Sequence, residues 1–396
     1  MINTDSQKID EILTRGVEDI FILDSLRKKL ASGQPLRVKF GADPTGPKIH
    51  IGRAVPLRKL KAFQDLGHQI IILVGDFTAQ IGDPSDKLGK RPMLAKEEVE
   101  KNMADYKEIY GKILNINKVE FVYNSDWLGK LGFGEICQLA ESFSIQQMLN
   151  RRNFKDRTAK GEEISLREFL YPLMQGYDSV QIKADVEIGG FDQLFNLKAG
   201  RVIQKHYGQP EQDILTCQML EGTDGRKMST SWGNVINITD ESNDMYGKIM
   251  SLKDELIAKY FILCTDLPLG EIENIKRQLA DGANPRDIKM CLAKKIVTMY
   301  HGDKVAREAE EYFVTAFQKK EVPANLEEVR VEKNKLLVDV LLKQHVIKSK
   351  SEFRRLIDEE AIITLPDEKK IEDANFIVQE PIILKIGKKR FLKLKI

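Results

Sequence analysis

Residues 38–57 read VKFGADPTGPKIHIGRAVPL, and this stretch decides the fold that we expect. Val38 and Phe40 alternate with charged residues, which predicts a short strand, and the glycines and prolines that follow predict a tight turn. Apolar residues at helical spacing come next. The free N–H groups and the dipole of a helix N-terminus favour an anion, His50 can donate to one, and Gly52 permits close approach. The stretch therefore predicts a nucleotide site, although it lacks the GxxxxGK[ST] pattern of a P-loop.

Length and composition bound the class of protein. A chain of 396 residues with 42% hydrophobic and 31% charged residues predicts two or three folded domains. No apolar run approaches the roughly 20 residues of a membrane span, and the polar N-terminus is unlike a signal peptide, so we expect a cytoplasmic protein without membrane contact. The four scattered cysteines suit reduced thiols and predict no metal site. With a net charge of +2, any nucleic-acid-binding surface must be local.

Strand and helix patterns alternate along the first half of the chain. Further strands are expected at 69–76, 119–124, 184–188 and 214–219, with a helix at about 96–114 between two of them. This alternation predicts an α/β fold with a doubly wound parallel sheet, whose ligands bind at the carboxyl ends of the strands. Residues 1–36 are expected to form mostly one amphipathic helix followed by a linker.

The remaining segments have other patterns. Residues 125–160 have helical spacing of apolar side chains, which indicates either a helical excursion that packs on a partner subunit or a solvated surface lobe. Residues 235–325 lose strand character and suggest packed helices. Residues 331–396 contain 15 Lys/Arg against 11 Asp/Glu, with basic residues interleaved among helix and strand patterns. Such a pattern suits phosphate binding, whereas a purely solubilising tail would not need a core.

Tyr171, Gln175 and Asp178 stand at spacings that place them on one helix face. A polar stripe of this kind is either solvated or lines a pocket. Because the neighbouring residues are mostly apolar, the pocket is favoured.

Five blocks now carry a resemblance to the tyrosyl-tRNA synthetases, in the family's order. They are DPTGPKIHIG, GDFTAQIGDPSDK, YPLMQGYDSV, GGFDQLFN and KMSTS, and SKSEFRRLI resembles an S4-type RNA-binding domain. The resemblance covers nearly the whole chain, and the residues VKFG at the first block are similar to those of one bacterial subgroup of the family. It implies a Rossmann-like catalytic domain at 1–225 with a helical insertion at about 125–165. It also implies a loop and an α-helical anticodon-binding region at 226–328, and then a small α+β S4-like domain at 329–396. The family further implies a homodimer.

The family resemblance also implies roles for single residues in tyrosine binding. Asp178 would accept a hydrogen bond from the substrate phenol, and Gln193 would lie near the substrate carboxylate. The residues expected to bind tyrosine are Lys39, Thr78, Asp83, Tyr171, Gln175, Asp178 and Gln193, of which Tyr171, Gln175 and Asp83 would hold the ammonium group.

The resemblance likewise implies the ATP and tRNA contacts. The residues expected to bind ATP are Gly41, Asp43, His50, Gly52, Gly190, Asp192, Lys227, Ser229 and Thr230. The expected catalytic residues, which stabilise charge on the phosphates, are Thr45, His50 and Lys227. The residues expected to bind tRNA are Arg354, Arg355, Lys388, Lys389 and Arg390.

The implied reaction is attack of the tyrosine carboxylate on the α-phosphorus of Mg–ATP, and then transfer of tyrosine to tRNA(Tyr). An ionised carboxylate needs no general base, so the site has to supply position and positive charge rather than a triad or a tightly bound cofactor. Two alternatives stay open: a tryptophanyl-tRNA synthetase, and a catalytically impaired RNA-binding paralogue.

Three residues depart from the family pattern. Arg53 replaces the last histidine of the HIGH signature, and Thr230 replaces the second lysine of KMSKS, so that Arg226 or Lys227 has to supply the missing charge. Lys39 stands where many relatives have a tyrosine. It either binds the phenol in another way or points to the rim of the pocket.

Overall fold

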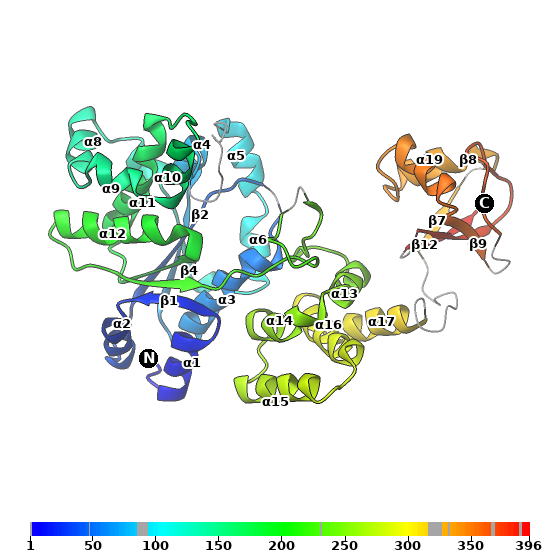
Figure 1. The fold of residues 1–396 in the computed structure, drawn as a ribbon, viewed down its shortest axis with the longest axis horizontal. Helices are drawn as coiled ribbons and strands as arrows, with labels where there is room; N and C mark the ends of the chain where they lie inside the picture. The colour runs from blue at the N-terminus through cyan, green and yellow to red at the C-terminus, as the bar shows by residue number, and fades with distance from the viewer. Residues whose placement is uncertain are drawn as a thin grey trace. The chain divides into compact units, whose positions relative to one another are not determined.

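A six-stranded sheet organises the larger of two units in this computed structural model, which describes residues 2–46, 48–84, 94–229, 232–315, 327–331, 333–365, 369–387 and 390–396. The larger unit comprises Met1–Asp240 and Ser251–Leu292, and the smaller one Glu241–Met250 and Ala293–Ile396. The strand order is β1-β6-β5-β2-β3-β4 (Figure 1). The strands are β1 (Val17–Phe21), β2 (Arg37–Ala42), β3 (Gln69–Val74), β4 (Val119–Tyr123), β5 (Val186–Gly190) and β6 (Asp213–Cys217).

All neighbouring strands of this sheet are parallel except β1, which pairs antiparallel with β6. Strand β2 lies between β3 and β5. Strands β3 and β4 follow on one side of it and strands β5 and β6 on the other, so the strand order reverses at β2. The apolar side chains of β3 are buried, as expected for a strand covered on both faces. The predicted Rossmann-like doubly wound α/β fold is therefore confirmed.

The larger unit also contains helices, several of which pack against these strands (Figure 1). They are α1 (Ser6–Thr14), α2 (Leu23–Ala31), α3 (Ile51–Asp65), α4 (Asp76–Ile81), α5 (Lys96–Met103), α6 (Tyr106–Gly111), α7 (Ser125–Leu128), α8 (Phe133–Ala140), α9 (Ile145–Leu149), α10 (Arg152–Ala159), α11 (Leu166–Ile182), α12 (Leu194–His206), α14 (Ile257–Cys264) and α15 (Leu269–Ala280). Helix α16 (Pro285–His301) crosses the boundary between the units.

The structure corrects three predictions about these elements. Residues 1–36 form two helices with β1 between them, because Gly16 at φ +62° ends α1 and the edge of β6 offers a pairing partner. The expected helix at 96–114 is divided into α5 and α6. The strand expected at 69–76 ends at Val74 and is followed by α4, while residues 85–87 of the block GDFTAQIGDPSDK lie outside the described ones.

The smaller unit contains α13 (Ser242–Met250) and α17 (Asp303–Phe313), followed by a small α+β domain. That domain has strands β7 (Glu327–Arg330), β8 (Lys335–Leu336), β9 (Ile362–Leu365), β10 (Ile377–Val378), β11 (Ile382–Ile386) and β12 (Arg390–Lys395), with helices α18 (Leu337–Lys343) and α19 (Lys350–Asp358). Four strands form a sheet in the order β7-β12-β11-β9. The described part of the predicted helical stretch, residues 235–315, is mostly helical, and residues 316–325 lie outside the described ones.

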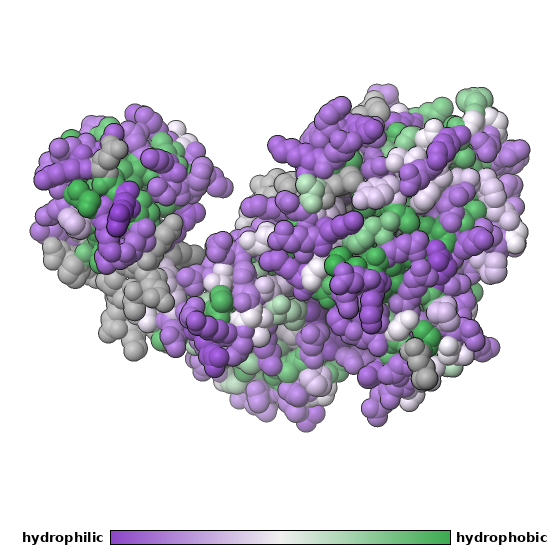
Figure 2. Space-filling view, turned by 180° about the vertical axis from the view of Figure 1, so that it is seen from behind, coloured by the Kyte–Doolittle hydropathy of each residue, from purple (hydrophilic) through white to green (hydrophobic). Residues whose placement is uncertain are grey.

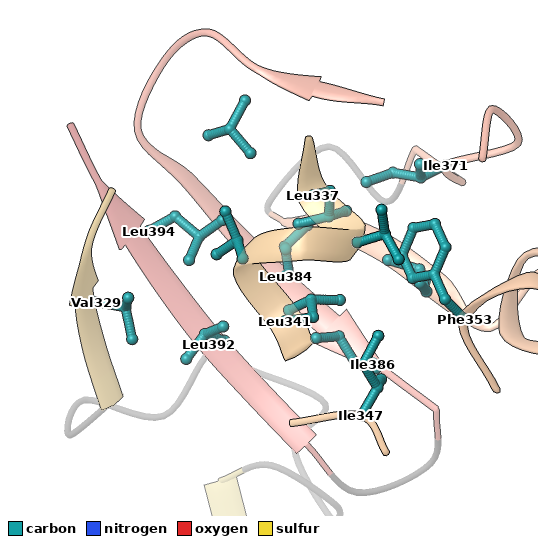
Figure 3. Close-up of a cluster of buried hydrophobic side chains, with 14 of the residues drawn as sticks. Val329, Leu337, Leu341, Ile347, Phe353, Ile371, Leu384, Ile386, Leu392 and Leu394 are labelled. Carbon is teal, nitrogen blue, oxygen red and sulfur yellow. The ribbon is translucent and has the colours of Figure 1, made fainter. Parts of the chain in front are cut away.

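The surface of the molecule is mostly hydrophilic on the face in Figure 2, with separate apolar patches. No helix among the described residues is long and apolar enough to span a bilayer. The apolar residues of the C-terminal domain instead form a core of their own, in which Leu337 and Leu341 of α18 pack with Phe353 of α19 and with Leu384 and Leu392 of the sheet (Figure 3). The apolar alternation of the tail therefore builds a folded domain, as predicted.

Helices α11 and α12 approach each other closely at Gly176. A Cβ at this position would lie 2.6 Å from Ile203 Cδ1 and 3.0 Å from the carbonyl oxygen of Ala199. Gly176→Ala should therefore force the helices apart and lower the free energy of unfolding of this unit by about 1–3 kcal/mol. Urea unfolding followed by circular dichroism measures it. Gly270→Ala is the control, because a Cβ there meets nothing within 4 Å; equal losses in both variants would refute the packing argument.

Candidate active site

One cavity of about 330 Å³ opens where the carboxyl ends of β2, β3, β5 and β6 meet. Ligands are expected at this edge of a doubly wound sheet. Most of the residues singled out from the sequence line it: Gly41, Asp43, Thr45, His50, Gly52, Thr78, Asp83, Tyr171, Gln175, Asp178, Gly190, Asp192, Gln193 and Lys227. Residues that are distant in sequence are thus brought together around one cavity.

Helix α11 presents its polar stripe to this cavity. Tyr171, Gln175 and Asp178 all line the wall, and Tyr171 and Asp178 are buried. The Ser165 cap and the apolar residues of α11 hold the helix against α12 and the core. The alternative of a solvated stripe is therefore wrong.

Asp43 joins three elements at the end of β2. Its Oδ2 accepts a hydrogen bond from Tyr171 Oη at 2.8 Å, and its Oδ1 accepts one from Thr78 Oγ1 at 2.8 Å. A Cβ on Gly75 would collide with Asp43 Oδ1, so position 75 has to be glycine. Because Tyr171 donates its only hydroxyl proton to Asp43, its oxygen stays available as an acceptor toward the cavity.

Asp178 is held by two residues for which the sequence predicted no role. Trp127 Nε1 donates to Asp178 Oδ1 at 2.8 Å, and Asn124 Nδ2 donates to Oδ2 at 3.3 Å. Burial raises the pKa of Asp178 to about 7, against the opposing charge of Lys39 and these hydrogen bonds. Asn124 directly follows β4 and Trp127 lies in α7. Their position just after a predicted strand was the sequence signal that could have identified them as residues of the site.

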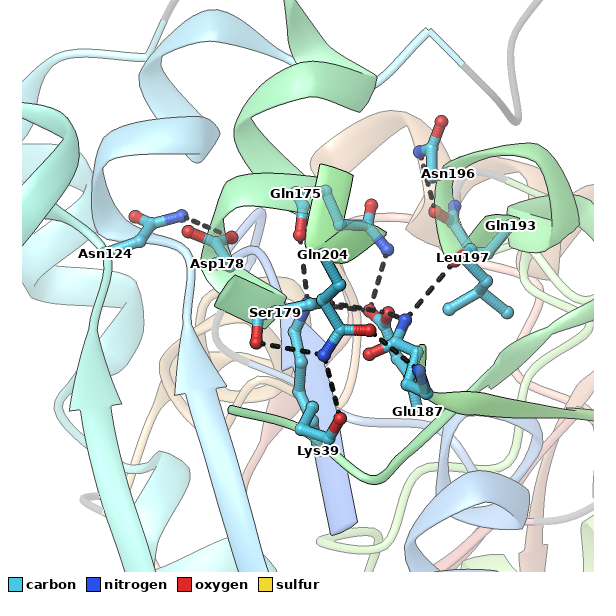
Figure 4. Close-up of polar contacts among 12 residues, drawn as sticks. Lys39, Asn124, Gln175, Asp178, Ser179, Glu187, Gln193, Asn196, Leu197 and Gln204 are labelled. Atoms are coloured by element: carbon cyan, nitrogen blue, oxygen red, sulfur yellow. Dashed lines mark hydrogen bonds and ion pairs between the residues drawn. The ribbon is translucent and has the colours of Figure 1, made fainter. Parts of the chain in front are cut away.

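Lys39 lies inside the protein beside the pocket. Its side chain is 0% exposed, and Nζ lies 2.9 Å from Glu187 Oε1, 2.8 Å from Ser179 Oγ and 3.0 Å from the carbonyl oxygen of Gln175 (Figure 4). These three acceptors match the three protons of an ammonium group. Lys39 therefore does not point to the rim. It is also missing from the described residues that line the cavity, so the structure corrects the predicted contact with the substrate to a supporting ion pair.

His50 is the N-cap of α3. Its Nδ1 accepts a hydrogen bond from the Arg53 backbone N–H at 3.2 Å, which leaves the ring proton on Nε2 as a donor. Burial, aided by the positive charges of Arg53 and Lys227, lowers the pKa of His50 to about 4. The ring is therefore neutral at pH 7. The side chain of Arg53 reaches Thr45 Oγ1 at 3.4 Å, so the substituted arginine adds charge beside the predicted phosphate donors.

The loop after β6 is ordered around Asn234. Its Nδ2 donates to Asp224 Oδ1 at 2.8 Å and to the Lys227 carbonyl at 3.1 Å, and its Oδ1 accepts from the Ser229 backbone at 2.8 Å. Lys227 lines the cavity. Arg226 instead forms an ion pair with Asp224 and stacks on Trp232, 4.9 Å from the ring centroid.

Lys227 rather than Arg226 therefore faces the site in this structure. Ser229, unlike Lys227, is absent from the described residues of the cavity wall, and Thr230 lies outside the described residues.

Asp83 and Gln193 form a polar pair in the same cavity. Gln193 Nε2 donates to Asp83 Oδ2 at 2.7 Å, and Asn196 Nδ2 approaches Asp83 Oδ1 at 3.4 Å. Gly190 at the end of β5 leaves room for Asp192, because a Cβ there would lie 2.5 Å from Asp192 Oδ1.

The predicted RNA contacts lie in the smaller unit. Arg354 and Arg355 are exposed on α19, and Arg390 donates to the carbonyl oxygen of Val346. Lys388 and Lys389 lie outside the described residues.

Two further cations of the tail are paired within that unit. Lys393 and Lys395 both pair with Glu328, and their hydrogen bonds lower the pKa of Glu328 to about 2.

Comparisons with known proteins extend these findings. The model of the family "tRNA synthetases class I (W and Y)" matches residues 31–318. A tyrosine–tRNA ligase of Carboxydothermus hydrogenoformans is 47% identical over 97% of this chain and 97% of its own length, and one of Thermotoga maritima is 45% identical over 97% and 96%. A tyrosyl-tRNA synthetase of Archaeoglobus fulgidus, solved in complex with L-tyrosine, has a TM-score of 0.63 and 21% identity, covering 77% of this chain and 99% of that one. This structural match shows a shared fold.

His50 should titrate with a pKa of about 4, well below the ordinary 6.5, and Lys227→Met should raise that pKa because it removes one of the positive charges that lower it. NMR titration of ¹³C-labelled histidine measures the value, with His50→Asn for assignment. Lys61→Met, at a surface lysine of α3, should leave it unchanged. An ordinary pKa in the wild-type protein would contradict the buried, neutral donor.

Proposed function

This chain belongs to the class I tRNA synthetases of the W and Y family, among the tyrosine–tRNA ligases, and from that premise we propose how it works. It activates L-tyrosine with Mg–ATP to tyrosyl-adenylate and pyrophosphate, and then transfers tyrosine to the 3′ end of tRNA(Tyr). The observation that carries the proposal is a single cavity that contains the buried carboxylate of Asp178 together with His50 and Lys227. A carboxylate acceptor suits a phenol O–H, and the other two residues suit phosphate oxygens.

Tyrosine binding follows from the acceptors in the cavity. Asp178 accepts from the phenol, while the Tyr171 oxygen, Gln175 and Asp83 accept from the ammonium group. Gln193 lies near the substrate carboxylate, which attacks the α-phosphorus in line. Because that carboxylate is ionised at neutral pH, no general base is required, and orientation supplies much of the rate.

ATP binding uses the glycine-rich ends of the strands. Gly41, Gly52 and Gly190 admit the nucleotide against the backbone, and Asp192 accepts from the ribose hydroxyls. The neutral His50, with Thr45, donates to the α-phosphate without adding a buried charge. Lys227 supplies a positive charge as pyrophosphate departs. Asp43, Ser229 and Thr230 make the remaining contacts with ATP. Mg²⁺ arrives with ATP as part of the substrate, and the reaction needs no tightly bound cofactor.

The amino acid that the enzyme activates distinguishes a tyrosyl-tRNA synthetase from a tryptophanyl-tRNA synthetase. Tyrosine should support pyrophosphate exchange, whereas tryptophan should not, because a buried carboxylate beside Gln175 matches a phenol better than an indole. Tyrosyl-tRNA synthetases are themselves the standard example of such discrimination: a site built to bond a hydroxyl rejects the analogue that lacks it. Exchange with tryptophan alone, or with neither amino acid, would overturn the proposed activity.

A homodimer is proposed through the helical insertion. Leu139 and Met148, which belong to the helically spaced apolar residues of 125–160, are buried within the unit. Phe133, Ile145 and Leu166 remain 81%, 71% and 77% exposed, respectively, which is typical of a surface covered by a second copy. We also place the enzyme in the cytoplasm, where its four free cysteines would stay reduced.

Tyrosine affinity should fall as the pH decreases below about 7. The phenol binds best to ionised Asp178, whose pKa is about 7, so protonation weakens binding by at most roughly tenfold per pH unit. His50 adds nothing in this range because its pKa is about 4. Equilibrium dialysis between pH 5.5 and 8.5 measures the profile. Asp178→Asn should bind weakly at all these pH values; the same slope in that variant would assign the proton to another group.

The C-terminal domain is proposed to hold tRNA through its backbone phosphates. Arg354→Ala with Arg355→Ala should weaken tRNA binding. The slope of the logarithm of the binding constant against the logarithm of the salt concentration should become shallower by roughly one unit for each phosphate that is no longer neutralised. Pyrophosphate exchange should stay unchanged. Filter binding at several salt concentrations measures the slope. Lys393→Met with Glu328→Gln is the control, since it removes one charge of each sign from a paired site. An unaltered slope in the arginine variant would remove α19 from the RNA-binding surface.

A further inference from the structure

Glu187 is a buried carboxylate in the cavity wall that the proposed mechanism has not used. It lies in β5 directly opposite Lys39 in the register with β2, and it is 1% exposed. Oε1 accepts from Lys39 Nζ at 2.9 Å and from Gln175 Nε2 at 3.2 Å. Oε2 accepts from Ser179 Oγ at 3.2 Å (Figure 4). It also accepts from Gln212 Nε2. Four donors therefore converge on one acceptor group.

The contact with Gln175 fixes which end of that amide faces the cavity. An amide side chain has a donor end and an acceptor end, and the donor end is bound to Glu187. Turning the amide over would bring its oxygen against Glu187 Oε1 with no proton between the two acceptors. In a buried site such a contact is costly, because neither oxygen can turn to water instead. The carbonyl oxygen of Gln175 is consequently kept on the side away from Glu187.

Lys39 completes this arrangement from the neighbouring strand. It neutralises the carboxylate and also donates to the backbone oxygen of Gln175 at 3.0 Å. The ion pair thus holds residue 175 at two points, the backbone through Lys39 and the side chain through Glu187. A buried pair of this kind brings little net stability compared with apolar residues, so its value lies in the geometry that it imposes.

We propose that Glu187, supported by Lys39, is a positioning residue that orients the Gln175 amide so that its oxygen accepts from the ammonium group of tyrosine. This inference rests on the proposed activation of tyrosine. It assigns Lys39, one of the three residues that depart from the family pattern, to the ammonium end of the substrate through Gln175 rather than to direct contact with the phenol.

The test compares two ligands that differ only in the ammonium group. In Lys39→Met with Glu187→Gln, both buried charges are removed and the volumes are nearly kept. The new amide can present either of its ends to Gln175, so the orientation is no longer fixed. The dissociation constant for tyrosine should rise roughly tenfold, in line with a hydrogen bond to a charged group. The constant for 3-(4-hydroxyphenyl)propionate, which keeps the phenol and the carboxylate, should not change, and KM for ATP should not change either.

Gln175→Ala supplies the matched control. In that background the double substitution should weaken tyrosine binding no further, because the oriented acceptor is already gone. Glu187→Asp, if folded, should recover part of the affinity. An equal loss for tyrosine and for the analogue, or no loss for either, would overturn the positioning role. Failure of the wild-type enzyme to exchange pyrophosphate with tyrosine would instead overturn the proposed function, whatever the Glu187 variants do.

Discussion

Strand β2 is paired with β3 along its whole length and with β5 at Val38 and Lys39, and the rest of the site depends on this parallel register. Because the strands run in the same direction, their carboxyl ends meet at one edge, where Asp43, Gly75 and Gly190 come together. A shift of one residue would exchange the two faces of β2 and separate Lys39 from Glu187. The sheet therefore sets both the place of the cavity and the pairing of the charges beside it.

The buried carboxylates Glu187 and Asp178 of this region both have specific partners. Glu187 has Lys39, and Asp178 has Trp127 and Asn124. These contacts explain how polar residues occupy positions that would otherwise be apolar core. They also leave the acceptors of the pocket in fixed orientations before any substrate arrives, which is the form of preorganisation that catalysis by positioning requires.

Much of this organisation could be predicted from local sequence, and the exceptions have a common cause. The strand at 69–76 and the polar face of α11 were visible because periodicity is a local property. Strand β1 was missed, since its pairing partner β6 lies about 200 residues away along the chain. The partners of Asp178 and the ion pair of Lys39 were missed for the same reason. Side chains from different strands and helices meet only after the sheet has assembled, so no spacing along the chain predicts these contacts.

Trp127 and Trp232 are the two tryptophans of the sequence. One lies at the proposed tyrosine pocket and the other in the proposed phosphate-binding loop. The indole of Trp127 donates to Asp178, so its emission should respond to the charge of that carboxylate and to a phenol placed beside it. Trp232 is 55% exposed under the guanidinium of Arg226, in the loop that carries Lys227. The molecule thus contains one intrinsic optical reporter for its amino-acid pocket and another for its phosphate loop, and replacing either indole by phenylalanine would let the two signals be followed separately in time.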